Sequence, residues 1–232
     1  VHFLAGPEHL ADAGWKVLVR NVSDIAAMGG VPTHAIAAVS GASFEDLRSI
    51  HEGMEQASRQ YGCPVVGGDL SGGPTIVITV SILGRVEDTT PVLRSGARAG
   101  DQLFVTGPLG AASAGLRLLR GDPRAMGPLV DAHRRPVARI VEGQLAAVLG
   151  ATSMIDVSDG LGIDLGRIAD ASGVGFALDD VPIAGGASEE DAIGGGEDYE
   201  LVFSVPPDTD IERRFTEARL RRPLRIGEVV AR

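Results

Sequence analysis

The feature that most constrains the fold and function of this chain is a glycine turn directly before an apolar strand. The turn presents two acids and a tyrosine at the start of that strand. Residues 194–201 read Gly-Gly-Gly-Glu-Asp-Tyr-Glu-Leu, and Leu201 opens the apolar run. Glycine reaches backbone conformations closed to other residues, so the turn can direct Glu197 and Asp198 toward a cation or a substrate amine. A surface turn that enters a strand has a similar composition, so the segment alone only suggests a binding site.

Two further acidic elements have both a structural and a functional interpretation. Asp24 lies in a helical stretch with apolar neighbours, where an unpaired carboxylate is costly and a bound cation would remove that cost. A lone acid in a helix is nevertheless usually solvated. Gly67-Gly68-Asp69 ends an apolar strand, which a hairpin turn explains. The same glycines could admit a nucleotide close to the backbone while Asp69 binds magnesium.

The pattern Asp156-Val157-Ser158-Asp159-Gly160 is the most specific of the acidic elements. Strand alternation places Asp156 and Ser158 on one face and leaves Asp159 at the junction with the next helix. Ser158 or Asp159 can simply cap that helix. Capping is compatible with ligand binding, because helix amides attract phosphate oxygens while a carboxylate holds the metal ion.

Charge and residue usage restrict the possible partners. A net charge of -10 disfavours nonspecific binding to nucleic acid or to an anionic membrane, and no apolar run is long enough to span a bilayer. Lys16 is the only lysine and no Gly-x-x-x-x-Gly-Lys-Ser/Thr pattern surrounds it, which excludes a P-loop. A phosphotransferase of this composition must use metal ions, arginine and backbone amides. Cys63 is the only cysteine and is expected to be buried, which fits a cytoplasmic protein.

Hydrophobic spacing predicts an α+β chain of two domains, residues 1–95 and 96–232, with the boundary in the glycine- and arginine-rich link. Ser43 and Asp46 form a capping-box pattern, and Gly62 ends the helix that follows. We expect residues 185–191 to form a solvated loop. The predicted helices are 10–25, 44–61, one around 116–119, 136–149, 160–172 and 209–220. The predicted strands are 33–40, 63–67, 75–86, 103–105, 153–157, 174–179, 199–205 and 224–230.

These elements, in this order, resemble the thiamine-monophosphate kinases, within the superfamily that includes aminoimidazole ribonucleotide synthetase. The resemblance runs almost end to end. It implies an N-terminal α/β domain whose sheet joins that of a second copy in a homodimer, and then a C-terminal α+β domain. The residues that the resemblance implies for magnesium are Asp24, Asp69 and Asp159. Those implied for ATP are Gly68, Asp69, Arg94 and Ser158, and those for thiamine phosphate are His2 and Glu197.

The chain departs from this family at both ends. It begins at Val-His-Phe, after the place where the family has a glycine–aspartate–aspartate segment with further magnesium ligands. It ends soon after Ile226-Gly227-Glu228, before the family's terminal segment with an aromatic that stacks on the substrate. We therefore expect either a fragment of a longer protein or a protein that has lost part of its site.

The resemblance implies ATP-dependent phosphorylation of thiamine monophosphate to thiamine diphosphate, a step of thiamine biosynthesis in the cytoplasm, assisted by Mg²⁺. An ionised phosphate nucleophile needs no general base, so the rate would come from positioning and charge neutralisation. Other enzymes of the superfamily are alternatives: aminoimidazole ribonucleotide synthetase, selenophosphate synthetase or a hydrogenase-maturation dehydratase. A nucleotide-binding dimer without turnover is another. The segments 23–28 and 196–201 favour the kinase.

Overall fold

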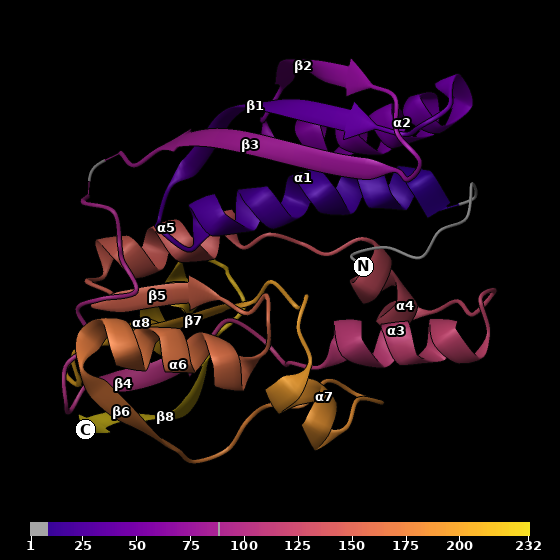
Figure 1. The fold of residues 1–232 in the computed structure, drawn as a ribbon. Helices are drawn as coiled ribbons and strands as arrows, with labels where there is room; N and C mark the ends of the chain where they lie inside the picture. Colours follow the sequence, from indigo (N-terminus) through magenta and orange to yellow (C-terminus); the bar gives the residue numbers. More distant parts are fainter. Residues whose placement is uncertain (1–8, 88) are drawn as a thin grey trace.

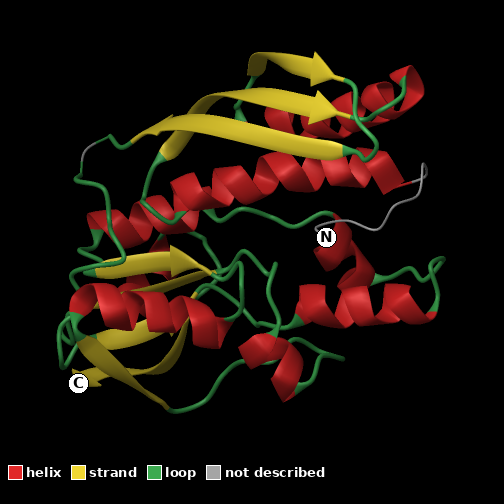
Figure 2. Ribbon diagram, viewed as in Figure 1, coloured by secondary structure: helices red, strands yellow, loops and turns green. Residues whose placement is uncertain are grey.

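Two separate β-sheets form the framework of the protein. The structure is a computed structural model, and it describes residues 9–87 and 89–232. A three-stranded sheet has the order β2-β1-β3, and a five-stranded sheet has the order β5-β7-β4-β8-β6. Helix α1 lies between the two sheets (Figures 1 and 2). The α+β class predicted from the sequence is confirmed.

The smaller sheet has one covered face and one open face. Its elements are α1 (Leu10–Ala26), β1 (Val31–Ser40), α2 (Phe44–Tyr61), β2 (Val65–Ser71) and β3 (Val77–Arg85). Strand β1 is central, parallel to β2 and antiparallel to β3. Helices α1 and α2 pack on one face, where Leu10, Ile50 and Met54 are buried with Val39. On β3 the side chains alternate between this covered face and the open one, as a strand with period two requires.

The larger sheet is covered on both faces. Its elements are β4 (Gln102–Val105), α3 (Ala111–Gly121), α4 (Pro128–Arg134), α5 (Ile140–Val148), β5 (Ser153–Asp156), α6 (Leu161–Ser172), β6 (Val174–Leu178), α7 (Glu189–Gly194), β7 (Leu201–Val205), α8 (Ile211–Glu217) and β8 (Leu224–Ala231). One face carries stacked Phe104, Phe203 and Phe215, whose neighbouring ring centroids are 5.9 and 6.2 Å apart. Leu165 and Ile168 of α6 pack on the other.

Several local predictions are confirmed. The capping box of α2 is formed by Ser43 and Asp46, and Gly62 ends the helix in the left-handed conformation. Cys63 is fully buried. Strand β2 runs on to Ser71, beyond the predicted end at residue 67, because its pairing with β1 continues. Within the described ranges, none of the helices combines the length and the apolar character needed to cross a bilayer.

The prediction of a solvated loop at residues 185–191 is wrong in its second half. Ser188 caps a short helix, α7, and the buried carboxylate of Asp191 completes the capping box. Asp191 also accepts hydrogen bonds from Ser113 at 2.8 Å and from Arg117 at 2.5 Å. These contacts reach α3, about 75 residues earlier in the chain. They could not be predicted from the local run of acids that suggested a loop.

A short segment before α5 attaches the C-terminal layer to α1 and α2. Trp15 donates its indole N–H to the carbonyl of Pro136 at 3.0 Å, and the amide of Ala138 donates to the hydroxyl of Tyr61 at 3.0 Å. Arg135 pairs with Asp12, Nε to Oδ1, at 2.6 Å. Residues 135–139 make these contacts outside any helix, so α5 starts at Ile140 and not at the predicted residue 136. The domain boundary at residues 95 and 96 stays a prediction.

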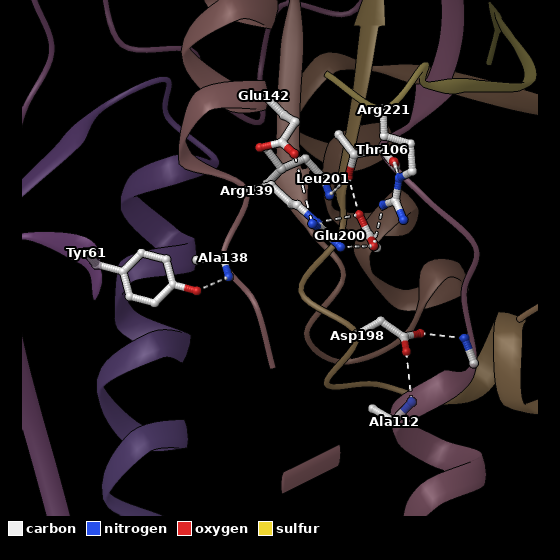
Figure 3. A network of polar contacts seen from close by, with 11 residues as sticks. Tyr61, Thr106, Ala112, Ala138, Arg139, Glu142, Asp198, Glu200, Leu201 and Arg221 are labelled. Atoms are coloured by element: carbon white, nitrogen blue, oxygen red, sulfur yellow. Dashed lines mark hydrogen bonds and ion pairs between the residues drawn. The ribbon is translucent and has the colours of Figure 1, made fainter. Parts of the chain in front are cut away.

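A buried carboxylate fixes the start of β7 (Figure 3). Glu200 accepts hydrogen bonds from Arg139 at 2.7 and 3.0 Å, from Arg221 at 2.6 Å and from the Thr106 hydroxyl at 2.5 Å. Burial alone would raise the pKa of Glu200, but the two guanidinium groups outweigh it and hold the pKa below 4.5. Leu201 donates its amide back to the Thr106 hydroxyl at 2.8 Å. The strand β7 therefore begins at a buried carboxylate whose charge and hydrogen bonds are both matched by its neighbours.

We predict that Glu200→Gln lowers the free energy of unfolding by about 3 kcal/mol, because it leaves Arg221 without its counter-charge and Arg139 with Glu142 alone, at 3.9 Å. The folded-state pKa of Glu200 is lowered, so its contribution is complete above pH 4.5 and is lost as the pH falls. Denaturant titrations from pH 7 into acid should show the stabilities of wild type and variant converging as the pH falls through the folded-state pKa of Glu200. Glu217→Gln, which removes an exposed ion pair with Arg213, is the control. Equal losses for both variants would contradict the prediction.

Candidate functional site

Backbone hydrogen bonds join two of the acidic elements at the adjacent ends of β5 and β7. The amide of Glu197 donates to the carbonyl of Ser158 at 3.0 Å, and the amide of Tyr199 donates to the carbonyl of Val157 at 3.0 Å. The approach is close, since a Cβ on Gly196 would lie 2.4 Å from the Ser158 oxygen. The glycine turn is thus required for this contact, which places Glu197 beside the turn after β5.

The element around Asp24 reaches the same place from the N-terminal layer. Ser23, on α1, donates its hydroxyl to Oδ2 of Asp156 at 2.7 Å, and both side chains are buried. Burial raises the pKa of Asp156 to about 6; the Ser23 hydrogen bond opposes this shift, whereas the Asp24 and Asp164 carboxylates add to it. Asp156 is therefore a carboxylate whose charge the protein only partly compensates.

Asp24 and Arg94 lie near one another at this junction between the layers. The Asp24 side chain is exposed, yet the surrounding protein displaces enough water to raise its pKa, against the effect of the neighbouring Arg20 and of Arg94. Arg94 is exposed in the link between the two sheets. The structure thus brings together three charged side chains, called the junction cluster below: Asp24, Arg94 and Asp156.

The turn at residues 158–160 is organised by a residue that the sequence did not single out. The amides of Ser158, Asp159 and Gly160 all donate to Oδ2 of Asp164, at 3.0, 3.0 and 3.2 Å. Neither Ser158 nor Asp159 caps α6, contrary to the structural interpretation of this motif, because the N-cap position is Gly160, which has no side chain to accept a hydrogen bond. Asp159 is half-exposed and pairs with Arg167. Its carboxylate faces solvent, where a ligand can reach it.

Glu197 combines a strained backbone with an ion pair to a buried lysine. Its φ angle is +69°, which a residue with a side chain rarely adopts. Lys16 Nζ lies 2.7 Å from Glu197 Oε2, and His133 Nδ1 lies 3.3 Å from the same oxygen. Burial lowers the pKa of His133 to about 4, so this imidazole is neutral near pH 7. The sequence analysis used Lys16 only to exclude a P-loop and gave no role to His133, although a sole lysine in a largely apolar helix was an available signal.

Gly68 and Asp69 occupy β2, the outer strand of the smaller sheet. A Cβ on Gly68 would lie 1.7 Å from the carbonyl oxygen of Ala37, so strand packing alone requires this glycine. Gly68 and Asp69 line a mainly apolar cavity of about 360 Å³ between β2 and α2. His51 also lines it, a residue to which the sequence analysis assigned no role.

Asp69 does not join the junction cluster within one protomer. It is paired with Ala38 near the end of β1, whereas α1 ends close to the start of β1 at Val31. Seven residues of strand span about 23 Å. Asp24, near the C-terminus of α1, is therefore far from Asp69. The structure therefore brings together the acidic elements around Asp24, Asp156 and Glu197, whereas the element around Asp69 lies apart from them.

The carboxylate oxygens at the junction are ligands that suit magnesium, but the protein does not supply a complete coordination shell. Among the described residues, no group of three or more His, Cys, Asp or Glu side chains could hold a metal ion. Magnesium typically takes one or two carboxylates together with substrate phosphates and water. Asp24, Asp156 and Asp159 supply hard oxygen donors of this kind. Asp156 was not among the magnesium ligands that the family resemblance implied. His2 lies outside the described residues.

Family models match the chain in two parts. Residues 1–86 match the model of the AIR synthase related protein, N-terminal domain, and residues 98–232 match that of the C-terminal domain. The thiamine-monophosphate kinase of Bacillus subtilis is 34% identical over 223 residues, covering 88% of this chain and 69% of the relative. That of Escherichia coli K12 is 36% identical over 222 residues, covering 88% and 67%.

Solved structures agree with this assignment. The thiamine-monophosphate kinase of Stenotrophomonas maltophilia K279a superposes with a TM-score of 0.89 at 30% identity, over 100% of this chain and 79% of that one. A structure described as AaThiL complexed with AMPPCP and TMP gives 0.88 at 32% identity, over 100% and 78%. The hydrogenase maturation protein HypE in complex with ATP gives 0.78 at 19% identity, over 94% and 71%, and shares the fold. The chain belongs to the thiamine-monophosphate kinase family of AIR synthase related proteins.

Proposed function

We propose that this protein transfers the γ-phosphoryl group of ATP to thiamine monophosphate and so forms thiamine diphosphate. The names of its relatives support this activity. The structural observation that carries it is the convergence of Asp24, Arg94 and Asp156 at the turn that holds Ser158 and Asp159. A cytoplasmic location, where ATP is available, is part of the proposal.

The transfer is an in-line displacement. An oxygen of the substrate phosphate forms a bond to the γ-phosphorus while the bond to the β,γ-bridging oxygen breaks, and ADP leaves with that electron pair. The attacking phosphate is ionised near neutral pH, so no side chain has to remove a proton. Arg94 and the Ser158 hydroxyl bind the polyphosphate and orient it, since a guanidinium matches phosphate oxygens with two parallel hydrogen bonds.

Magnesium is part of this proposal. Asp24 and Asp159, with Asp156 and Asp69, are the residues that would hold it. When bound, the ion neutralises charge on the phosphates and so favours the transition state. The raised pKa values of Asp24 and Asp156 support this role, because both carboxylates lack full compensation by the protein.

The cavity beside β2 is the proposed site of the nucleoside. Its volume of about 360 Å³ and its apolar lining suit a purine ring, and Gly68 and Asp69 lie on its wall. A nucleotide bound there would extend its phosphates past Asp69. Within one protomer Asp69 lies far from Asp24, so the arrangement calls for a second copy of the chain.

We further propose a homodimer formed through the open face of the smaller sheet. Large apolar side chains on its strands are between 51 and 63% exposed: Ile36, Val66, Val77 and Leu83. A contiguous apolar face of this kind on a sheet is typical of an interface. Pairing two such faces could bring Asp69 of one copy to the junction cluster of the other.

We predict that Asp69→Asn and Asp159→Asn each slow phosphoryl transfer at least about 100-fold while leaving the fold intact. Each substitution removes one charge from the phosphate-binding region without changing the shape of the side chain. The assay is ADP release with thiamine monophosphate and saturating magnesium, with circular dichroism to check folding. Asp170→Asn, on the exposed surface of α6, is the matched control. Turnover near that of wild type in either site variant would refute its assignment.

We predict a dimeric mass by light scattering at micromolar concentration, and a monomeric mass for Leu83→Glu, because the charge would be buried in the interface. Mixed dimers test whether the site is shared. If Asp69 of one copy serves the junction of the other, Asp69→Asn chains combined with Asp159→Asn chains should regain activity in one of their two sites. A wild-type monomer argues against the dimer, and mixed dimers without activity argue against a shared site.

We predict that Glu197→Gln raises the KM for thiamine monophosphate at least about tenfold and changes the KM for ATP little, because Glu197 lies on the substrate side of the junction. Steady-state kinetics against each substrate, with melting curves in parallel, separate this role from a purely structural one. Equal changes in both KM values, or a loss of stability with unchanged affinity for thiamine monophosphate, would remove Glu197 from the substrate site.

A further inference from the structure

The ion pair between Lys16 and Glu197 is the feature that the proposed function does not explain. Lys16 is the only lysine in the chain, and its side chain is 6% exposed. It reaches from the middle of α1 to a carboxylate 181 residues later in the sequence. A buried ammonium is costly unless it is paired, so the position of Lys16 is tied to that of Glu197.

We propose that Lys16 is a positioning residue for the substrate: it neutralises Glu197 and fixes its carboxylate so that the second oxygen accepts a hydrogen bond from an amino group of the substrate. This inference rests on the proposed function, in which Glu197 contacts thiamine monophosphate. It assigns Glu197 to the neutral aminopyrimidine and not to the cationic ring.

The distribution of contacts on the carboxylate supports this assignment. Lys16 Nζ and His133 Nδ1 both lie against Oε2, at 2.7 and 3.3 Å. Within residues 9–87 and 89–232, Oε1 makes no hydrogen bond, and the Glu197 side chain is 21% exposed. Among the described residues, the protein thus holds one oxygen of the carboxylate and leaves the other open to a donor.

The local charge balance decides which part of the substrate such a carboxylate recognises. Lys16 contributes one positive charge and Glu197 one negative charge, and His133 adds none near pH 7 because its pKa is about 4. A carboxylate already neutralised at 2.7 Å offers little net attraction to a second cation. It remains a strong acceptor for an N–H group, and a fixed acceptor discriminates sharply against an analogue without the donor.

Strain in the backbone agrees with a fixed orientation. Glu197 and Tyr199 both have positive φ angles, +69° and +52°, on either side of Asp198. Asp198 is anchored by the amides of Gly110 and Ala112 at 2.6 and 3.0 Å (Figure 3). The main chain therefore holds Glu197 from one side while Lys16 holds its carboxylate from the other.

The experiment is a double-mutant cycle of Lys16→Met and Glu197→Gln, with Lys16→Arg as the charge-conserving variant. Lys16→Met should raise the KM for thiamine monophosphate about tenfold, with kcat and the KM for ATP within about twofold of wild type. Lys16→Arg should recover part of the loss. In the Glu197→Gln background, Lys16→Met should add less than about twofold, because Lys16 acts through Glu197. Melting curves monitor folding.

A substrate analogue gives a second readout. Wild type should prefer thiamine monophosphate over the analogue in which oxygen replaces the pyrimidine amino group, and both Glu197→Gln and Lys16→Met should lose most of that preference. Both compounds carry the same cationic ring, so an equal loss of affinity for each would assign Glu197 to the cation and overturn the inference. An effect of Lys16→Met that is equally large in both backgrounds would also overturn it, since Lys16 would then only join the two layers.

Calorimetric titration of thiamine monophosphate without ATP separates this inference from the proposed function. A wild-type protein that does not bind thiamine monophosphate overturns the proposed substrate and this inference with it. Wild-type binding that Lys16→Met retains unchanged overturns the inference alone. Binding that weakens about tenfold in Lys16→Met, with an intact melting transition, supports it.

Discussion

The site depends on how the protein neutralises the buried carboxylate of Glu200. An uncompensated charge in that position would cost several kcal/mol, so its partners must all be in place for β7 to start where it does. Arg139 comes from the start of α5, Arg221 from the segment after α8, and Thr106 from the end of β4. One side chain thereby ties three distant parts of the C-terminal layer to the acidic turn.

That anchoring allows the turn to hold strained residues. Positive φ angles at Glu197 and Tyr199 cost about 1 to 3 kcal/mol each. Asp198 and Glu200 face the C-terminal layer, where backbone amides and arginines bind them (Figure 3). Glu197 faces the other way, toward α1 and Lys16. The alternation makes this turn a physical link between the two layers.

Within one protomer, the charged junction cluster and the apolar cavity beside β2 lie in different places. The junction cluster contains carboxylates and an arginine, as the proposed charge neutralisation requires, whereas the cavity beside β2 is mainly apolar, as the proposed nucleoside site requires. Asp69 belongs to the second place and not to the first. The open apolar face of the smaller sheet offers a physical means of combining them, and the proposed function depends on whether two copies do so.

Local patterns in the sequence determined the main helices and strands, the capping box of α2, the exclusion of a P-loop and the acidic elements that indicated the family. They did so because each depends on residues within a few positions of one another. Only the tertiary structure decided that Asp191 binds Ser113 and Arg117 of α3, that Asp164 accepts hydrogen bonds from the amides after β5, that Lys16 pairs with Glu197, and that Asp69 lies far from Asp24. The packing between the two layers sets these distances. Partners as far apart in the chain as Lys16 and Glu197 cannot be recognised from the local spacing of hydrophobic residues.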